Sequence, residues 1–181
     1  DPQTSIEETL EAFDALVQEG KVRYIPASNF TALRLQESIE TSKKAGMTCY
    51  VAAQDHYNLL ERDYETSLKP TMLQNSLSQL PYFGLARGFL TGKYRLGKNV
   101  NSVRSRGVAG YQSTRGWKLL EKLDALAQQH QTTVSAVALA WLRAQPTVAA
   151  PIASARNLEQ LKEIMLVVEL STEELEVLSN S

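Results

Sequence analysis

The sequence has little of what several large protein classes require. Cys49 is the only cysteine, so no disulfide can form within the chain and no site with several thiolate ligands is available. His56 and His130 are the only histidines. Neither has cysteine or acidic partners at metal-ligand spacing, which argues against a metal centre, and we expect His130 to be solvated. No apolar run approaches the ~20 residues that a membrane-spanning helix needs, so we expect no membrane partner.

An excess of charge of one sign is also missing. Lysine and arginine total 19 and aspartate and glutamate total 20, which gives a formal net charge of -1. No basic stripe interrupts this balance, so we expect no nucleic acid partner. The length of 181 residues suffices for a sizeable core, and we expect a single domain over residues 1–181 in a reducing, cytoplasmic setting.

What the chain does contain is a series of short apolar runs, each ending in a polar cluster that precedes a helical stretch. Four such runs predict strands at residues 22–27, 47–53, 80–85 and 148–153. Apolar stripes and caps predict helices between Ser5 and Gly20, over residues 30–45, 61–75, 117–129 and 133–144, and after Asn157 and Ser171. Pro70 should kink or restart the third of these helices.

Alternating strands and helices are typical of an α/β protein with a parallel sheet. A closed (β/α)8 TIM barrel has eight such units, whereas this chain holds four and opens on a helix without a preceding strand. A four-stranded open sheet would leave two edges unpaired. We therefore expect the chain to supply about the C-terminal half of a barrel, with the N-terminal half missing upstream or supplied by another chain. The start at Asp1, without methionine, favours a truncated or processed product.

Polar side chains follow the first two predicted strands. Ser28 and Asn29 suit hydrogen bonds to an amide or a phosphate, although Asn29 or Thr31 can equally be a helix N-cap. Gln54 can recognise an amide because its side chain carries both a donor and an acceptor. His56 offers a general base or a ligand, but a structural or exposed histidine is the favoured interpretation because it lacks partners.

The third cluster, at residues 81–88, is denser. Tyr82 can stack on a flat ring, and Gly84 and Gly88 allow a ligand to approach the backbone closely. Arg87 can hold a phosphate in its guanidinium fork. The alternative is a core aromatic pair followed by a turn, but the concentration of unusual residue types favours a binding role.

The fourth cluster precedes the helix that begins after Asn157. Ser154 and Arg156 lie beside a helix N-terminus, which favours anions, so the sequence predicts a phosphate pocket; the alternative is a capped helix with a surface arginine. Between the third and fourth clusters, residues 87–112 form a long, basic stretch rich in glycine and serine. Loops of this length are often functional, and we expect this one to cover a bound ligand.

Taken together, these stretches resemble the C-terminal part of an aldo/keto reductase. The motifs cover nearly the whole chain, and several of them in the right order are far more specific than any one alone. The resemblance is carried by Gly20-Lys21-Val22-Arg23-Tyr24-Ile25, Ala27-Ser28-Asn29-Phe30, Gln54, Tyr57-Asn58-Leu59-Leu60-Glu61-Arg62, Leu85-Ala86-Arg87-Gly88-Phe89-Leu90-Thr91-Gly92-Lys93-Tyr94, Ala138-Leu139-Ala140-Trp141-Leu142, Pro151-Ile152, Ser154 and Gln160-Leu161.

The resemblance implies a TIM barrel that binds NADPH in an extended form without a Rossmann fold, in agreement with the absence of a G-x-G-x-x-G motif. By position, Ser28, Asn29 and Gln54 would hold the nicotinamide carboxamide, and Tyr82 would stack on the nicotinamide ring. The residues that would wrap the pyrophosphate are Phe83, Gly84, Leu85 and Arg87, with the loop at 87–112 as a strap.

The same resemblance assigns the adenosine end of the cofactor. Ser154, Arg156 and Gln160 would meet the 2′-phosphate, and Glu163 would meet the adenine. The sequence departs from the family pattern at several points: proline replaces a usual glycine at Pro26, Phe83-Gly84 replaces a common Ser-Pro, the stretch 76–80 lacks the expected glycine and β-branched residues, and Ile164 replaces an asparagine.

The family's catalytic aspartate, tyrosine, lysine and histidine come from the first half of the barrel, so no catalytic residue is assigned here. We expect an NADPH-dependent oxidoreductase that reduces aldehydes and ketones, with a small carbonyl substrate, and we expect the 181-residue chain alone to be inactive. One alternative is a non-catalytic NADPH-binding regulatory subunit of the same family, or an inactive fragment. Another is an unrelated phosphate-binding barrel with converged loops.

Overall fold

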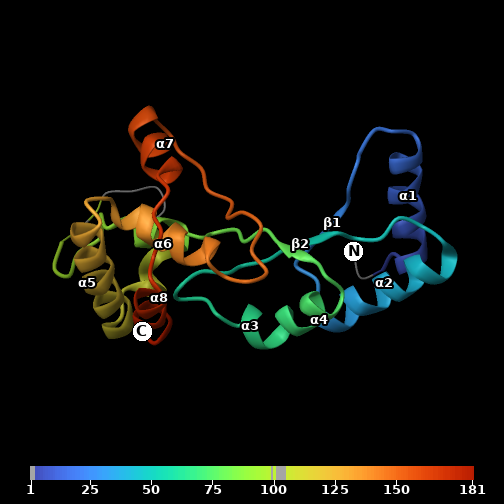
Figure 1. The fold of residues 1–181 in the computed structure, drawn as a ribbon. Coiled ribbons are helices and arrows are strands. Elements are labelled where there is room, and N and C mark those ends of the chain that lie inside the picture. The colour runs from blue at the N-terminus through green and yellow to red at the C-terminus, as the bar shows by residue number, and fades with distance from the viewer. Residues whose placement is uncertain (1–2, 99, 101–104) are drawn as a thin grey trace. The chain divides into compact units, whose positions relative to one another are not determined.

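The computed structural model describes residues 3–98, 100 and 105–181, and the chain divides into two compact units. Unit 1 comprises residues 1–55 and 63–80, and unit 2 comprises residues 56–62 and 81–181. Figure 1 shows the elements of both units in chain order. Across the described ranges, no helix is long and apolar enough to cross a membrane.

Unit 1 contains a parallel sheet with strand order β1-β2-β3. In its register Ala27 pairs with Ala53, which in turn pairs with Gln79. Both faces of the central strand are largely buried, as expected for a parallel sheet. The elements of unit 1 are α1 (Ile6–Gln18), β1 (Pro26–Ser28), α2 (Ala32–Ala45), β2 (Ala52–Gln54), α3 (Tyr64–Ser67), α4 (Lys69–Gln74) and β3 (Ser78–Gln79).

The helix boundaries in unit 1 follow the predicted caps. The Ser5 hydroxyl accepts a hydrogen bond from the Glu8 N–H at 3.0 Å and begins α1. Gly46 ends α2 in a left-handed conformation with φ 69°, which glycine adopts at little cost. Pro70 lies in the first turn of α4, so the expected restart of the helix at this proline is confirmed.

The strands are shorter than predicted because the first residues of each apolar run complete the preceding helix. The N–H groups of Lys21 and Val22 both bond to the carbonyl of Leu16 in α1, and the Met47 N–H bonds to the carbonyl of Ser42 in α2. Backbone donors used in this way cannot join a ladder. The predictions at 22–27 and 47–53 therefore overlap β1 and β2 only at their carboxyl ends, and the third strand lies at 78–79 instead of 80–85.

The predicted fourth strand at 148–153 is wrong, since this described segment is not a strand. It runs beside the residues that precede Tyr82, and the Ile152 N–H donates to the carbonyl of Pro81 at 2.8 Å. Pro81 has no N–H to donate to this segment, so the ladder cannot extend toward the preceding residues. The described residues thus form a three-stranded sheet and not the expected four-stranded half barrel.

Unit 2 is built around α6, of which nearly every residue is buried. Its Trp141 ring packs against Tyr57 with ring centroids 5.5 Å apart. Residues of α5 point inward at helical spacing, as predicted. The elements of unit 2 are the 3-10 segments η1 (Ala86–Thr91) and η2 (Ser105–Tyr111), and the helices α5 (Thr114–Gln129), α6 (Val134–Arg143), α7 (Leu158–Met165) and α8 (Thr172–Ser179).

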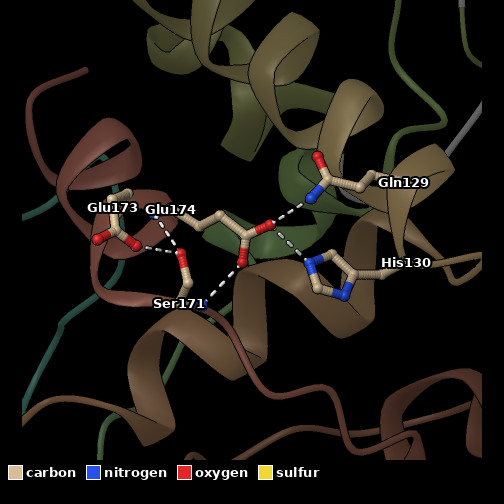
Figure 2. Close-up of polar contacts among 5 residues, drawn as sticks. All are labelled: Gln129, His130, Ser171, Glu173 and Glu174. Carbon is tan, nitrogen blue, oxygen red and sulfur yellow. Dashed lines mark hydrogen bonds and ion pairs between the residues drawn. The ribbon is translucent and has the colours of Figure 1, made fainter.

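The C-terminal helix α8 is attached to the end of α5 by a polar cluster (Figure 2). The Glu174 carboxylate accepts hydrogen bonds from Gln129 at 2.9 Å and from the Ser171 N–H at 2.8 Å, and lies 2.8 Å from the His130 Nε2 atom. Ser171 and Glu174 form a capping box at the start of the helix that was predicted after Ser171. The expectation that His130 is solvated is confirmed only in part, because its side chain is 25% exposed and contacts this carboxylate.

Candidate functional site

Unit 2 contains a tightly wound segment directly after Pro81. Phe83, Ala86 and Arg87 have left-handed φ values of 52°, 46° and 56°, and Gly88 has φ 98°. The turn is closed by hydrogen bonds from the Ala86 N–H to the Phe83 carbonyl at 2.7 Å and from the Gly88 N–H to the Leu85 carbonyl at 2.8 Å. Each non-glycine residue in this region costs on the order of 1–2 kcal/mol. Such concentrated strain is typical of functional sites.

Gly84 allows this segment to pack against α6, in addition to the close approach of a ligand that the sequence suggested. A Cβ atom at this position would lie 2.8 Å from the Leu142 Cδ1 atom and 3.5 Å from the Leu139 Cδ2 atom, both on α6. Because these leucines are buried, they have little room to move away. The glycine therefore lets the segment lie directly on α6, whereas the sequence suggested only close approach to a ligand.

A second wall comes from the residues that lead into α7. The Asn157 side chain caps this helix by accepting a hydrogen bond from the Gln160 N–H at 2.9 Å. The Gln160 Oε1 atom in turn accepts from the Arg156 N–H at 3.0 Å. These two bonds hold the backbone of Arg156 in place at the helix N-terminus.

The two walls enclose a cavity of about 420 Å³ within unit 2. This size lies within the usual range for small-molecule sites. Nine of the twelve residues predicted to bind cofactor line it: Tyr82, Phe83, Gly84, Leu85, Arg87, Ser154, Arg156, Gln160 and Glu163. Segments about 70 residues apart in the sequence therefore line one cavity, although the segment before Ser154 is not the strand that was predicted there.

The electrostatics of this cavity favour an anion. Its lining carries three cationic side chains, Arg87, Lys93 and Arg156, against the single carboxylate of Glu163. The Arg87 guanidinium lies over the Phe83 ring, 4.0 Å from its centroid, in a cation–π contact, and it also interacts with the Tyr111 hydroxyl.

The other three predicted residues belong to unit 1 and lie together at the carboxyl ends of β1 and β2. The Ser28 hydroxyl donates to the Gln54 carbonyl at 3.3 Å and accepts from the Asn29 amide at 3.1 Å. Asn29 has a left-handed φ of 56° and also donates its N–H to the Gln54 carbonyl at 3.1 Å. The N-cap of α2 is Thr31, so Asn29 is not needed for that structural role.

A second, more polar cavity of about 490 Å³ lies in unit 2 and shares Arg87 with the first. Its lining includes His56, Tyr111 and Arg115. Burial, with a smaller contribution from Glu61, raises the pKa of Tyr111 to about 12, so its phenol stays a hydrogen-bond donor at neutral pH. Burial lowers the pKa of His56, which favours the neutral imidazole.

The expected covering loop at 87–112 lies partly outside the described residues, namely at 99 and 101–104. Its described parts include η1 and η2, which pack against each other. A Cβ atom on Gly107 would lie 3.2 Å from the Arg87 Cδ atom, so this part of η2 closely approaches the arginine. Its role as a cofactor strap stays a prediction.

Several lining residues of the first cavity had no binding role in the sequence interpretation. They are Thr91, Lys93, Ser135, Ile152, Ala153 and Ile164, whereas Gly88, which also lines the cavity, was expected to allow close approach of a ligand. Lys93 is the most important of them, because it adds a third positive charge. The sequence motif at 85–94 already pointed to this lysine, because it follows a glycine-rich basic segment. Ser135 gives no such signal, since it lies within the buried helix α6.

Comparison with known proteins gives a consistent result. The model of the aldo/keto reductase family matches residues 1–180. The chain is 33% identical over 171 residues to the uncharacterized oxidoreductase YrpG of Bacillus subtilis, covering 94% of this chain and 52% of the relative. It is 27% identical over 184 residues to the versiconal hemiacetal acetate reductase of Aspergillus parasiticus, covering 98% of this chain and 53% of the relative.

Among solved structures, the thermostable aldo-keto reductase Tm1743, crystallised with the inhibitor epalrestat, is similar with a TM-score of 0.77 and 29% sequence identity. The match covers 99% of this chain and 56% of that one. The chain therefore spans about half the length of the relatives that it matches.

Proposed function

Because the chain belongs to the aldo/keto reductase family, whose members usually use nicotinamide cofactors, we propose that it carries the NADPH-binding part of an enzyme that reduces aldehydes and ketones to alcohols. The observation that carries this proposal is the cavity in unit 2, where nine of the predicted cofactor residues lie together. Its excess of positive charge suits the phosphates of a dinucleotide.

The phosphate groups would be held by the cationic side chains and by backbone donors. Arg87 and Lys93 suit the pyrophosphate, because both line the cavity beside the wound segment. Arg156, next to the N-terminus of α7, suits the 2′-phosphate that distinguishes NADPH from NADH. Gln160 supports this arrangement by bonding to the Arg156 backbone, and Glu163 would meet the adenine.

The nicotinamide would be held by stacking and by amide recognition. Within unit 2, Tyr82 presents its ring in the cavity lining and suits stacking on the nicotinamide. Within unit 1, Ser28, Asn29 and Gln54 offer donors and acceptors of the kind that suits a carboxamide, the role that the family resemblance implies for them. When bound, the reduced nicotinamide supplies a hydride to the carbonyl carbon of the substrate. The residues of this chain bind and orient the cofactor so that one face of its ring is presented.

No proton donor is assigned within this chain. Tyr57 is fully buried against Trp141, and Tyr24 is 71% exposed on the surface of unit 1, so neither suits that role. We expect the purified 181-residue chain to bind NADPH without reducing a generic aldehyde such as benzaldehyde. NADPH consumption above the background rate would contradict this expectation. A regulatory subunit is the less favoured alternative: one relative, 32% identical over 177 residues, is named a putative voltage-gated potassium channel subunit beta, whereas others are named as a dehydrogenase, an oxidoreductase or a reductase.

The proposal is tested by the cofactor selectivity of an Arg156→Ala variant. We expect NADPH binding, followed by fluorescence and calorimetry, to weaken at least tenfold, because a charge-assisted contact to the 2′-phosphate is lost. NADH binding should change less than twofold. Lys162→Ala is the matched control, since Lys162 lies on α7, the helix that follows Arg156, but not in the cavity lining. Equal losses for both cofactors would remove the 2′-phosphate role, and no binding by the wild-type chain would refute the proposed function.

A further inference from the structure

The Tyr82 side chain is held by a residue that the cofactor argument leaves without a role. His56 and Tyr82 form a parallel β-bridge, and their rings stack with centroids 5.5 Å apart and planes at 16°. Phe83 meets both rings edge-on, at 5.3 Å from His56 and 5.1 Å from Tyr82. Three rings therefore pack together at the cavity wall, which restricts the orientation of each.

Asn58 holds the neighbouring backbone. Its Nδ2 atom donates to the Phe83 carbonyl at 3.0 Å, and its Oδ1 atom accepts from the N–H groups of Leu60 at 2.9 Å and Glu61 at 3.1 Å. These partners establish which end of the amide is the donor. Asn58 is fully buried, so loss of its amide donor would leave the Phe83 carbonyl without this partner. The contact helps to keep Phe83 in its left-handed conformation.

The contact between the His56 and Asn58 side chains requires a neutral imidazole. The His56 Nε2 atom lies 3.3 Å from the Asn58 Nδ2 atom, which is a donor, so Nε2 must accept. The Tyr111 hydroxyl, from η2, lies 3.5 Å from the same nitrogen. A protonated Nε2 would oppose the Asn58 donor. Two further charges act on His56, since Glu61 favours its protonation and Arg87 opposes it.

We propose that Asn58 and His56 are positioning residues for the cofactor site, which hold Tyr82 and the left-handed Phe83 in place while His56 is neutral. This inference rests on the proposed function, in which Tyr82 stacks on the nicotinamide. It makes the nicotinamide end of the site sensitive to acid through a side chain that does not line the first cavity. The effect should be the same for NADPH and NADH, because both carry the same nicotinamide.

The first test compares both cofactors across conservative variants at pH 8. His56→Ala removes the ring, and Asn58→Asp keeps the acceptor for Leu60 and Glu61 but removes the donor to Phe83. Each should weaken NADPH and NADH binding about tenfold while the ratio of the two affinities stays unchanged, in contrast to Arg156→Ala. His56→Phe keeps the stacked ring and should retain affinity within about threefold. A selective loss for one cofactor, or no loss, would overturn the positioning role.

The second test is the pH profile, measured with NADP⁺ because the reduced cofactor decomposes in acid. Wild-type affinity should fall more steeply between pH 7 and 5 than the affinity of His56→Phe. The 2′-phosphate titrates near pH 6 in every variant, so the difference between profiles isolates His56. His130→Gln, at the only other histidine, should keep the wild-type profile, as should Asp55→Asn, which removes the partly buried carboxyl directly before His56 in the sequence. Coincident profiles for wild type and His56→Phe would refute the requirement for a neutral imidazole.

A third measurement separates this inference from the proposed function. The NMR signals of the Tyr82 ring in the cofactor-free protein should shift as His56 is protonated, and should change in the His56→Ala variant. If the wild-type chain binds neither cofactor, the proposed function fails while these shifts still report whether His56 positions Tyr82. Tyr82 signals that are unaffected by both changes would overturn the positioning role itself.

Discussion

Asp55 gives unit 1 a pH dependence opposite in sign to that of most carboxylates. It directly follows β2, and its Oδ2 atom is buried with no hydrogen-bond partner among the residues that the structure describes. Burial raises the pKa of the Asp55 carboxyl from 3.8 to about 6. The folded protein therefore favours the neutral acid, and at neutral pH it holds a charge with incomplete compensation.

The sign and size of the effect follow from proton linkage. Between about pH 4 and pH 6 the folded state binds more protons at Asp55 than the unfolded state, so the free energy of unfolding falls as pH rises through this window. Above pH 6 the contribution is constant. A fully buried group with this pKa would lose about 3 kcal/mol. Because the carboxyl is only half-buried, solvent screening reduces the expected loss to about 1–2 kcal/mol.

Urea denaturation of the Asp55→Asn variant tests this reasoning. At pH 7.5 the variant should be more stable than wild type by about 1–2 kcal/mol, and at pH 4 the difference should vanish. The matched control is Asp124→Asn, which breaks only a partly exposed ion pair with Arg95 at 2.9 Å and should show no comparable pH-dependent gain. A variant that gains nothing at pH 7.5, or gains equally at both values, would show that Asp55 carries no burial penalty.

Two further substitutions test packing in unit 2. Gly116→Ala should lower the free energy of unfolding by about 2 kcal/mol or more, because the new Cβ atom would overlap the Tyr111 carbonyl oxygen, and this loss outweighs the better helix propensity of alanine. Gly110→Ala is the control and should have little effect, because no atom lies within 4 Å of the added Cβ. Similar losses of stability for both variants would contradict the predicted clash. Glu174→Gln should lower the free energy of unfolding by about 1 kcal/mol in urea denaturation at pH 7, and by less at pH 3. The hydrogen bond from the Ser171 N–H lowers the pKa of the Glu174 carboxyl, so the ionised carboxylate stabilises the folded state, and this contribution is lost as pH falls through that pKa. Glu176→Gln, on the exposed side of α8, should change stability little at either pH, and a loss equal to that of Glu174→Gln would argue against the cluster in Figure 2.

The polar clusters could be predicted from the sequence because a parallel sheet brings the carboxyl ends of its strands to one edge. Ser28, Asn29 and Gln54 meet in this way at the end of β1 and β2. The lengths of the strands could not be predicted, because apolar composition does not reveal where a backbone donor goes. Met47 lies in an apolar run that predicts a strand, yet its N–H bonds to the carbonyl of Ser42 at the end of α2.

Asn58 and Lys93 show why part of the site was missed. The role of Asn58 depends on the left-handed backbone of Phe83, and phenylalanine gives no signal for that conformation, which glycine and asparagine usually adopt. Lys93 was visible as part of a motif, but only the folded segment shows that it shares a cavity with Arg156. Sequence spacing identifies strand ends well, whereas side chains that return to a cavity from a long loop need the structure.

The Phe83-Gly84 pair, which departs from the Ser-Pro pair common in the family, makes contacts on two sides. Phe83 supplies the ring that Arg87 covers at 4.0 Å and that packs edge-on against His56. Gly84 supplies the space that Leu142 occupies, since any Cβ there would meet its side chain at 2.8 Å. Replacing Phe83 with serine alone would remove three contacts of its ring, those with His56, Tyr82 and Arg87. A bulkier residue at position 84 alone would collide with α6. The departure thus alters how the wall is held while the cationic lining of the cavity is kept, which is why it does not argue against a cofactor site.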